Sequence, residues 1–536
     1  MKKRLWWRDG VIYQIYPRSF MDTNQDGIGD LPGIIEKLDY LQDLGIDAIW
    51  LSPIYPSPDV DFGYDVSDYR TIDAKYGSMR DFDALVRQAH KRDIHIIMDL
   101  VLNHTSDQHP WFLDARSSRD SKFRDYYIWK DPRNGKVPNN WLSIFGGSGW
   151  EYDETTGQYY FHHFYKEQPD LNWRNPLVRK EMLDVLRFWL EKGVDGFRLD
   201  VFSAYFKHAD FPDNPRKFIG LRPHDRMRHI YDTDQPEMIP LLKEIRTLLD
   251  EYPERYAVGE TFMATYKKAA QYCGDDLLHA AFSFEEFLGG KWKASRFLKA
   301  IKTWEIILES KCWPNYVLNN HDVRRSASRY AKGQDDARLK VAAVMLLTLR
   351  GTPFLYYGEE IGMREGMFKK KDIQDPVGKR YYPFYKGRDG CRTPMQWNGS
   401  SFGGFSSVQP WLAVNPDYQT RNVQQQAEDE HSLLNFYKEL LHLRKEHIAL
   451  MRGDFEAATN MPSNTLVYFR CVVEEQIMVA LNFDERPKHL DLVNIGGQGC
   501  DLLLSTHVKP MQSSSKCSEY ILRGNEAAIF SLKMFD

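Results

Sequence analysis

Short apolar runs alternate with amphipathic helical patterns along most of this chain, and that alternation limits the possible folds more than any other feature. The first pair is residues 10–20, which read as a strand, and residues 31–45, which repeat apolar side chains at the period of a helix. Further strand candidates are residues 46–55, 94–101, 194–201, 256–261, 278–284, 315–320 and 352–360, most of them separated by helical patterns. Strands that alternate with helices in this way predict a parallel sheet.

Eight strands joined mainly by helices favour a (β/α)8 TIM barrel over a doubly wound open sheet, which is the alternative. The chain has 536 residues, which is too long for one compact domain. Residues 104–169, rich in Asp, Gly, Trp and Tyr, interrupt the alternation and predict an inserted subdomain after the third strand. Short β-like runs predict a C-terminal antiparallel β-sandwich domain over residues 461–536, so the barrel comprises residues 1–103 and 170–460.

Composition excludes several classes of function. The 71 basic and 75 acidic residues give a net charge of −4, which provides no electrostatic reason to expect nucleic acid or an anionic membrane as a partner. No apolar run approaches the roughly 20 residues of a membrane helix, and the start of the chain lacks a signal-peptide core. The six cysteines form no C-x-x-C pair. We therefore expect a soluble cytoplasmic protein without a zinc site.

Polar side chains crowd at the carboxyl ends of the predicted strands, where the active sites of TIM barrels lie. They are Asp99, Asn103 and His104 after strand three, Arg198 and Asp200 on strand four, Glu260 on strand five, and His321 and Asp322 on strand seven. One such Asp taken alone is more often a structural ion-pair partner or a helix cap. Several carboxylates and two histidines at four strand ends of one barrel instead favour a catalytic site. A metal site is the weaker alternative, because the residues lack ligand spacing such as H-x-x-x-H.

The predicted site has two different charge environments. Alternation along the strand puts Arg198 and Asp200 on one face, and an adjacent guanidinium lowers the pKa of a carboxyl and keeps it ionised. Glu260 follows the apolar residues 256–258 and has no cation nearby in sequence. We therefore expect Glu260 to have the raised pKa and to be the proton donor. Two carboxyl groups with such divided roles are what glycoside hydrolysis requires.

These motifs resemble those of the α-amylase family of glycoside hydrolases, family 13. DLVLNH, GFRLDV, VGET and NNHD occur in the order of that family's four conserved regions, and QPDLNW resembles a fifth. GRDGCRTPMQW and the length of the chain are similar to the α-glucosidase and oligo-1,6-glucosidase branch. The resemblance covers roughly residues 6–450 and implies a (β/α)8 barrel that cleaves short α-glucosides.

The resemblance also implies a role for each matching residue. Asp200 matches the nucleophile of a retaining mechanism, Glu260 the acid/base, and Asp322 the third carboxylate, which binds sugar hydroxyls. The other matches are sugar contacts: His104, His321 and Arg198, with Asp61 and Arg392 as a pair that anchors the terminal glucose and Tyr64 as an aromatic platform under it. Phe145, Phe164 and Gln168 lie on the insertion, where they either wall the sugar pocket or pack the subdomain. Packing is likewise the alternative for Tyr64, and a surface cap for Arg392.

The implied activity is that of an exo-acting, retaining α-glucosidase. It would release α-glucose from the non-reducing end of short α-1,4- or α-1,6-linked oligosaccharides or disaccharides, with transglycosylation as a side reaction. Val201 after the nucleophile resembles members specific for α-1,6 bonds, whereas Thr261 and Phe262 after the acid/base depart from the Met-Pro of those members. A strict oligo-1,6-glucosidase or dextran glucosidase is therefore the main alternative.

Two further alternatives have their own signals in the sequence. Arg324, Arg325 and Arg329 after Asp322 are either a solvated helix start or the lining of an acceptor site that resembles the one in sucrose isomerases. A non-catalytic, transporter-associated relative would carry a membrane helix and lack the complete set of carboxylates. This chain has no apolar run long enough for such a helix and has all three carboxylates, Asp200, Glu260 and Asp322, so the sequence counts against a non-catalytic relative.

A short acidic loop predicts a metal site. Oxygen-bearing side chains recur at alternate positions from residue 22, as at the start of an EF-hand loop, but position twelve is Gly33 rather than the bidentate Glu. The resemblance implies a compact cation site that consists of Asp22, Asn24, Asp26, the Ile28 carbonyl and Asp30. Oxygen ligands favour a structural Ca²⁺, with Mg²⁺ as the alternative. A plain polar turn is less favoured because its carboxylates would repel one another. No organic cofactor is expected.

Overall fold

The computed structural model describes residues 4–220, 222–261, 265–282, 287, 290–308, 312–496, 499–507 and 518–533. Eight parallel strands form the central sheet: β1 (Ile12–Ile15), β2 (Ala48–Leu51), β3 (His95–Leu100), β7 (Gly196–Leu199), β8 (Tyr256–Glu260), β9 (Ala280–Phe282), β10 (Asn315–Val317) and β11 (Thr352–Tyr356). Their order is β10-β11-β1-β2-β3-β7-β8-β9, and contacts between β9 and β10 bring the ends of the sheet together. The predicted (β/α)8 barrel is confirmed. The end of the strand predicted at 278–284 lies outside the described residues, as does Phe262.

Helices surround this sheet and bury their apolar faces against it. Residues 31–45, predicted as one helix, form α2 (Leu31–Glu36) and α3 (Leu38–Leu44), because Lys37 between them departs from helical geometry at φ −100° and ψ 5°. A capping box of Ser78 and Asp81 starts α4 (Met79–His90). The other outer helices are α6 (Pro176–Glu191), α7 (Met238–Asp250), α8 (Tyr266–Ala270), α9 (Ala294–Leu308), α10 (Ser326–Tyr330) and α11 (Ala337–Thr348), and a short α1 (Trp6–Asp9) precedes β1.

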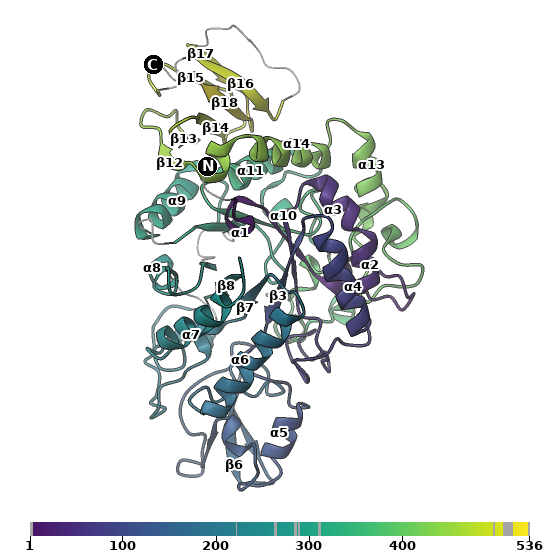
Figure 1. Ribbon diagram of the computed structural model, residues 1–536, viewed down its shortest axis with the longest axis vertical. Coiled ribbons are helices and arrows are strands. Elements are labelled where there is room, and N and C mark those ends of the chain that lie inside the picture. Colours follow the sequence, from purple (N-terminus) through teal and green to yellow (C-terminus); the bar gives the residue numbers. More distant parts are fainter. Residues whose placement is uncertain are drawn as a thin grey trace.

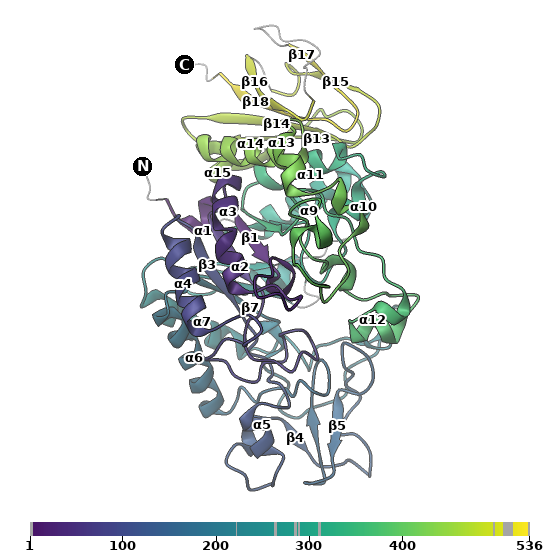
Figure 2. The ribbon, with the colours of Figure 1, turned by 90° about the vertical axis from the view of Figure 1, so that its right-hand side faces the viewer.

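The segment between β3 and α6 lies at one end of the molecule, and part of it packs against the core of the barrel (Figures 1 and 2). It contains α5 (Pro110–Ala115) and an antiparallel sheet of β4 (Trp129–Lys130), β6 (Gln158–Phe161) and β5 (Trp150–Asp153). Ile128, Trp141, Trp150 and Phe161 form its own apolar cluster. A β-bridge between His104 and Asp170 joins the two ends of the segment, so it leaves and re-enters the barrel at one place.

The C-terminal strands form two antiparallel sheets at the opposite end (Figure 1). One sheet contains β12 (Asp454–Ala457), β13 (Thr465–Cys471), β14 (Gln476–Asn482), β18 (Ala527–Leu532) and β16 (Cys500–Ser505). The other contains β15 (Lys488–Asp491) and β17 (Glu519–Leu522), and side chains from both sheets share one apolar cluster. β13 and β14 contact α9, α11 and α15 (Ile448–Arg452), and α15 in turn contacts α14 (Leu433–Glu446), so this sandwich lies against the helical layer far from the strand ends that hold the site.

A long irregular segment follows β11 and includes α12 (Pro376–Tyr381) and α13 (Val423–Glu428). Figure 2 shows α12 lying toward the inserted segment. There Arg380 donates from Nη1 to the Gly146 carbonyl at 2.9 Å, so the segment spans from the barrel to the insertion. In the part of the chain that the structure describes, no helix is long and apolar enough to cross a membrane, and Cys273, Cys391 and Cys471 are free thiols.

Candidate active site

The carboxyl ends of the barrel strands open into a cavity of about 190 Å³. Asp200 follows β7, Glu260 ends β8 and Asp322 follows β10, and all three predicted catalytic carboxylates line this cavity. The other lining residues are Asp61, Tyr64, His104, Ile144, Phe145, Phe164, Val201, Tyr385 and Arg388. The volume is below the roughly 300 Å³ at which pockets for drug-sized ligands begin, so it suits a single small ring.

Arg198 is the buried centre of the acidic side of this cavity. Its Nη1 contacts Asp99 at 2.7 Å and Asp200 at 2.5 Å, and its Nη2 contacts Glu260. Asp99 on β3 is the register partner of Arg198 on β7, and β8 is the next strand, which puts these side chains at one level of the barrel. As the alternation predicts, Asp200 lies beside Arg198, but three carboxylates share this single guanidinium.

This sharing reverses the expected charge preference of Asp200. Burial raises the pKa of Asp200 well above its usual range, the charges of Glu260 and Asp99 act in the same direction, and Arg198 only partly opposes them. The prediction of a lowered pKa is wrong because it assigned Arg198 to Asp200 alone. Burial also raises the pKa of Glu260, in the predicted direction, although the prediction that Glu260 has no cation nearby is wrong as well.

Asp322 has the opposite environment on the other side of the cavity. Its carboxylate contacts His321 Nε2 at 3.2 Å, Arg392 Nη2 at 2.9 Å and Arg388 Nη1 at 3.5 Å. Burial alone raises the pKa of a carboxyl, but these contacts outweigh burial and hold the pKa of Asp322 well below its usual range. At neutral pH Asp322 is therefore the firmly ionised carboxylate of the cavity.

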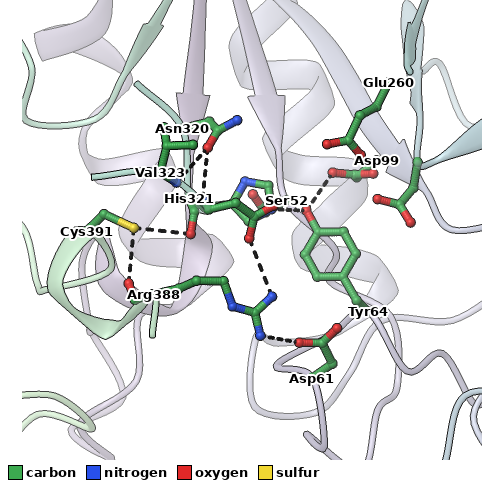
Figure 3. A network of polar contacts seen from close by, with 12 residues as sticks. Ser52, Asp61, Tyr64, Asp99, Glu260, Asn320, His321, Val323, Arg388 and Cys391 are labelled. Atoms are coloured by element: carbon green, nitrogen blue, oxygen red, sulfur yellow. Dashed lines mark hydrogen bonds and ion pairs between the residues drawn. The ribbon is translucent and has the colours of Figure 1, made fainter. Parts of the chain in front are cut away.

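A chain of hydrogen bonds connects the two sides (Figure 3). Gln14 donates from Nε2 to His321 Nδ1 at 2.8 Å, which leaves the ring proton on Nε2. His321 Nε2 donates to the Tyr64 hydroxyl at 2.7 Å, and that hydroxyl donates to Asp99 Oδ2 at 3.0 Å. Burial lowers the pKa of His321 to about 4, so the ring is neutral near pH 7. The Tyr64 ring stacks on His321 with centroids 5.2 Å apart. Tyr64 therefore packs against a neighbouring ring and also lines the cavity.

Arg388 forms the ion pair with Asp61 (Figure 3), and sequence reasoning missed this residue. Its Nη2 contacts Asp61 at 2.7 Å, and its Nε contacts Asp375 at 3.0 Å. The predicted partner, Arg392, is fully buried and donates to the His321 carbonyl at 2.8 Å instead. The structure thus pairs Asp61 with Arg388 rather than with Arg392, and the burial of Arg392 rules out the alternative of a surface cap. Both arginines belong to GRDGCRTPMQW, and only the fold decides which of them reaches Asp61.

The insertion supplies one wall of the cavity. Phe164 lines it, and Gln168 lies behind it, where its Nε2 donates to Asp61 at 3.3 Å and to the Tyr64 carbonyl at 3.2 Å. His104 contacts Gln168 at 3.1 Å and the same carbonyl at 2.9 Å, and burial lowers the pKa of His104 to about 4. Of the two interpretations of these insertion residues, the geometry supports a pocket wall for Phe164 and a supporting position for Gln168.

A buried ion pair behind His104 was not predicted. Lys207 Nζ contacts Asp170 at 2.5 Å and donates to Asn103 Oδ1 at 3.1 Å. Asn103 in turn donates from Nδ2 to Asp170 at 3.0 Å and lies 3.2 Å from His104 Nδ1. Lys207 follows GFRLDV by a few residues, so its apolar neighbours in sequence gave no sign of this contact.

Val201 lies in the cavity wall between the insertion and the acidic side. Its side chain packs with Ile144 and Phe164, and its N–H faces Glu260 Oε2 at 3.4 Å. The backbone is left-handed, at φ 33° and ψ 38°, which a β-branched residue rarely adopts. Val201, which was predicted to influence linkage, therefore contacts both the apolar pocket wall and Glu260, the predicted acid/base.

The arginine run after Asp322 splits into different environments. Arg325 is buried and donates to the Tyr357 carbonyl at 2.8 Å, and Arg329 donates to the Phe287 carbonyl at 3.2 Å. Arg324 is exposed and lines a second groove next to the cavity. Neither a solvated helix start nor an acceptor lining describes the whole run.

The loop predicted to bind a cation lies between β1 and α2, and none of its residues lines the cavity. Its carboxylates and amide accept backbone N–H groups: Asp22 from Gln25 at 2.8 Å, Asn24 from Asp26 at 3.0 Å, Asp26 from Ile28 at 2.8 Å, and Asp30 from Gly33 at 2.7 Å. Over the described ranges, no three His, Cys, Asp or Glu side chains gather into a metal-binding group. The five predicted ligands are all oxygens, including a neutral amide and a carbonyl, and as a donor set they fit Ca²⁺.

Comparison with known proteins finds a matching family model and similar proteins over most of the chain. The family model described as alpha amylase, catalytic domain, matches residues 14–453. The chain is 41% identical to an oligo-1,6-glucosidase of Parageobacillus thermoglucosidasius, with 99% of this chain and 100% of that protein covered. It is 43% identical to a probable alpha-glucosidase of Rhizobium meliloti, with 90% of each covered. The crystal structure of the alpha-glucosyl transfer enzyme XgtA superposes with a TM-score of 0.94 at 38% identity and covers 99% of this chain and 100% of that one.

Proposed function

The chain belongs to the alpha-amylase family, and from this premise we propose that it is a retaining, exo-acting α-glucosidase that releases α-glucose from short α-glucosides. The protein is thus a glycoside hydrolase that acts on O-glycosyl bonds of oligosaccharides or disaccharides. The observation that carries the proposal is the small cavity in which Asp200, Glu260 and Asp322 meet.

The shared contact of the two reacting carboxyls supports a retaining mechanism. Asp200 and Glu260 contact the two terminal nitrogens of the same guanidinium and so lie side by side, which favours the roughly 5–5.5 Å separation of a retaining enzyme over the roughly 6.5–9.5 Å of an inverting one. Glu260 donates its proton to the leaving oxygen while Asp200 attacks the anomeric carbon, which breaks the glycosidic bond and forms a β-glucosyl ester. Glu260 then removes a proton from water, the water oxygen displaces Asp200, and α-glucose is released.

The charge balance around Arg198 supports this division of roles. Three carboxylates share one guanidinium and the pKa of each is raised, so the group keeps a proton to higher pH than ordinary carboxyls do, and the titration belongs to the group rather than to one residue. Placing that proton on Glu260 leaves Asp200 ionised beside Arg198 for attack. Asp322 stays ionised at lower pH and accepts hydrogen bonds from the sugar hydroxyls.

Exo-action follows from how the cavity ends. The ion pair of Asp61 with Arg388 lies on the cavity wall beside Tyr64, and Arg388 is held by Asp375. Carboxylate and guanidinium together match the hydroxyls of a terminal glucose, whereas the insertion and the α12 segment, joined by Arg380 and Gly146, limit the length of chain beyond it. His104, His321 and Tyr64 contact the same sugar in this proposal.

The linkage stays a prediction with two options. Hydrolysis of both α-1,4 and α-1,6 bonds is the main one, and strict α-1,6 specificity is the alternative, favoured by Val201 in the wall and by the name of the relative that is 41% identical. Transfer to a sugar hydroxyl in place of water accompanies any retaining mechanism. We also keep the predictions of a structural Ca²⁺ at residues 22–30 and of a reducing, cytoplasmic location, for which the small number of cysteines and the free thiols of Cys273, Cys391 and Cys471 are the support.

Parallel hydrolysis of maltose, isomaltose, sucrose and trehalose tests the function. We expect release of α-glucose from maltose and isomaltose, with the α-anomer detected by NMR before mutarotation. Isomaltulose or trehalulose as the main product from sucrose would instead establish an isomerase. Initial release of β-glucose would rule out the retaining mechanism.

A further inference from the structure

A second groove adjoins the catalytic cavity, and apart from the residues that it shares with the cavity it has no role in the hydrolysis proposed above. Its volume is about 470 Å³, and it shares Asp322, Tyr385 and Arg388 with the cavity, so the two spaces are continuous. One wall includes Val323 and Arg324 after β10, and the other belongs to the segment after β11. With the terminal glucose in the cavity, the groove lies where a departing group, or an acceptor for transfer, can lie.

The rim of this groove is apolar and exposed. Phe384 and Met367 are 99% and 85% exposed, and Phe368 and Pro383 line the same groove. Large apolar side chains that are left open to water in one place mark a binding surface more often than isolated ones do. These residues offer contact to one face of a flat ring.

The groove also presents two cations that form no direct ion pair within the described part of the chain. Arg324 and Lys386 are exposed, and neither forms an ion pair with any residue that the structure describes. Of the two carboxylates that line the groove, Asp322 contacts Arg392, and Glu365 interacts with the charges of Arg325 and Arg329 as well as with that of Arg324. A ligand that brings a negative charge into the groove is therefore attracted.

Resting on the glucosidase activity proposed above, we propose that this groove binds the leaving group and prefers an aromatic ring that carries a carboxylate. A second sugar also has an apolar face, but it is uncharged and gains nothing from Arg324 and Lys386. A simple anion such as phosphate gains nothing from Phe384 and Met367. An aromatic carboxylate can contact both the apolar rim and the two cations of the groove.

Two matched substrates isolate the charge. The α-glucosides of 4-hydroxybenzoate and of 4-hydroxybenzamide have the same ring and size and differ in charge. At low salt we expect kcat/KM to favour the carboxylate about fivefold, which is the scale of two exposed ion pairs. The preference should fall toward one in 0.5 M NaCl because salt screens exposed charges.

Variants locate the effect within the groove. The double variant Arg324→Gln, Lys386→Gln should bring the preference to about one, and Phe384→Ala should lower kcat/KM for both aryl glucosides together. Lys370→Gln, an exposed lysine that does not line the groove, is the matched control and should leave the fivefold preference intact. Intrinsic reactivity of the two phenols cancels when each variant is compared with wild type.

The outcomes separate this inference from the function on which it rests. Turnover of maltose or isomaltose by each variant shows that it is folded and active. If wild type cleaves these disaccharides but does not prefer the carboxylate, or if the double variant retains the preference, the groove proposal is overturned and the glucosidase proposal stands. If no glucoside is cleaved, the glucosidase proposal itself fails.

Discussion

Asp200 and Asp322 lie on the same cavity, each just after a barrel strand, yet their surroundings shift their pKa values in opposite directions. Asp200 shares Arg198 with two other carboxylates, whereas Asp322 contacts two arginines and a histidine. Burial raises the pKa of both carboxyls, and it acts more strongly on Asp200, whose side chain is 8% exposed, than on Asp322, whose side chain is 35% exposed. The difference teaches that the ratio of cations to carboxylates, rather than the presence of an arginine, decides which carboxyl exchanges protons during a reaction and which one stays charged.

The largest expected effect is the loss of turnover on replacing Asp200, and the products formed in the presence of azide should distinguish Asp200 from Asp322. Asp200→Asn should lower kcat by about 10⁴-fold or more, because it removes the group that forms the covalent intermediate. Added azide should then attack from the vacated side and yield β-glucosyl azide from an activated aryl α-glucoside. Asp322→Asn should also lower kcat strongly, but with the nucleophile in place it should give no β-glucosyl azide. Wild-type turnover by Asp200→Asn would refute the assignment of the nucleophile.

Removing a cation from the Asp322 side is the next largest effect. Arg388→Gln leaves Asp61 and Asp375 without their shared partner and takes one cation from Asp322. Breaking a buried, hydrogen-bonded ion pair costs about 2–5 kcal/mol, so we expect KM for maltose to rise on the order of 100-fold, with a lower melting temperature.

Arg380→Gln is the matched control for this variant. Arg380 belongs to the same segment but donates only to exposed backbone carbonyls of the insertion. We expect its KM to stay within about threefold of wild type. Equal KM values for the two variants would contradict a specific role for the pair of Arg388 with Asp61.

The acidic side should respond through pH. A nucleophile must be ionised, so kcat/KM falls as pH decreases through the raised pKa of the Asp200 and Glu260 pair. The charge of Asp99 contributes to raising the pKa of Asp200. Asp99→Asn should therefore move the acid limb of the kcat/KM profile to lower pH, by about 0.5–1 unit.

Asp375→Asn provides the corresponding control on the other side. Asp375 is buried like Asp99 but contacts Arg388 rather than Arg198. We expect this variant to change KM and to leave the acid limb where it is. An acid limb that moves equally in both variants would mean that total charge, rather than the group around Arg198, sets the profile.

The sequence was sufficient for the barrel and for the residues that gather at its strand ends. Short apolar strands followed by helices with an apolar period of 3.6 are local signals, and Asp200 beside Arg198 follows from alternation on β7. Contacts between segments that are distant in the chain could not be predicted from the sequence. Arg388 meets Asp61 because the segment after β11 passes over the cavity, and no local pattern distinguishes Arg388 from Arg392.

The direction of the pKa shift of Asp200 could not be predicted from the sequence for the same reason. Sequence gives the neighbour on the same strand, which is Arg198, but not how many other carboxylates that neighbour serves. Asp99 and Glu260 come from the adjacent strands β3 and β8. Counting charges around a buried group requires the register of neighbouring strands, and that register is a tertiary property.

A smaller effect is expected where the acidic side meets the insertion. Val201 packs on Ile144 and Phe164, beside Glu260. Val201→Ala should lower the ratio of kcat/KM for isomaltose to that for maltose by about fivefold or more, since methyl-scale differences in a pocket are worth roughly 1–3 kcal/mol. Val323→Ala, which changes the groove instead of this wall, should leave the ratio within about twofold. An unchanged ratio in Val201→Ala would remove Val201 as a determinant of linkage.

The smallest effect on activity concerns a third group of carboxylates, in which no arginine takes part. Asp22 and Asp26 in the loop before α2 are held by backbone N–H groups, so their charge is left for a cation to balance. Ca²⁺ at about 100 times its Kd stabilises the folded state by about 2.7 kcal/mol, so a chelator should lower the melting temperature by a few degrees, and Ca²⁺ should restore it. Asp26→Asn should weaken Ca²⁺ binding measured by calorimetry. Since no loop residue lines the cavity, kcat at 25 °C should not change. Loss of activity on chelation at an unaltered melting temperature would contradict a structural ion and would place the cation among the groups that act on substrate.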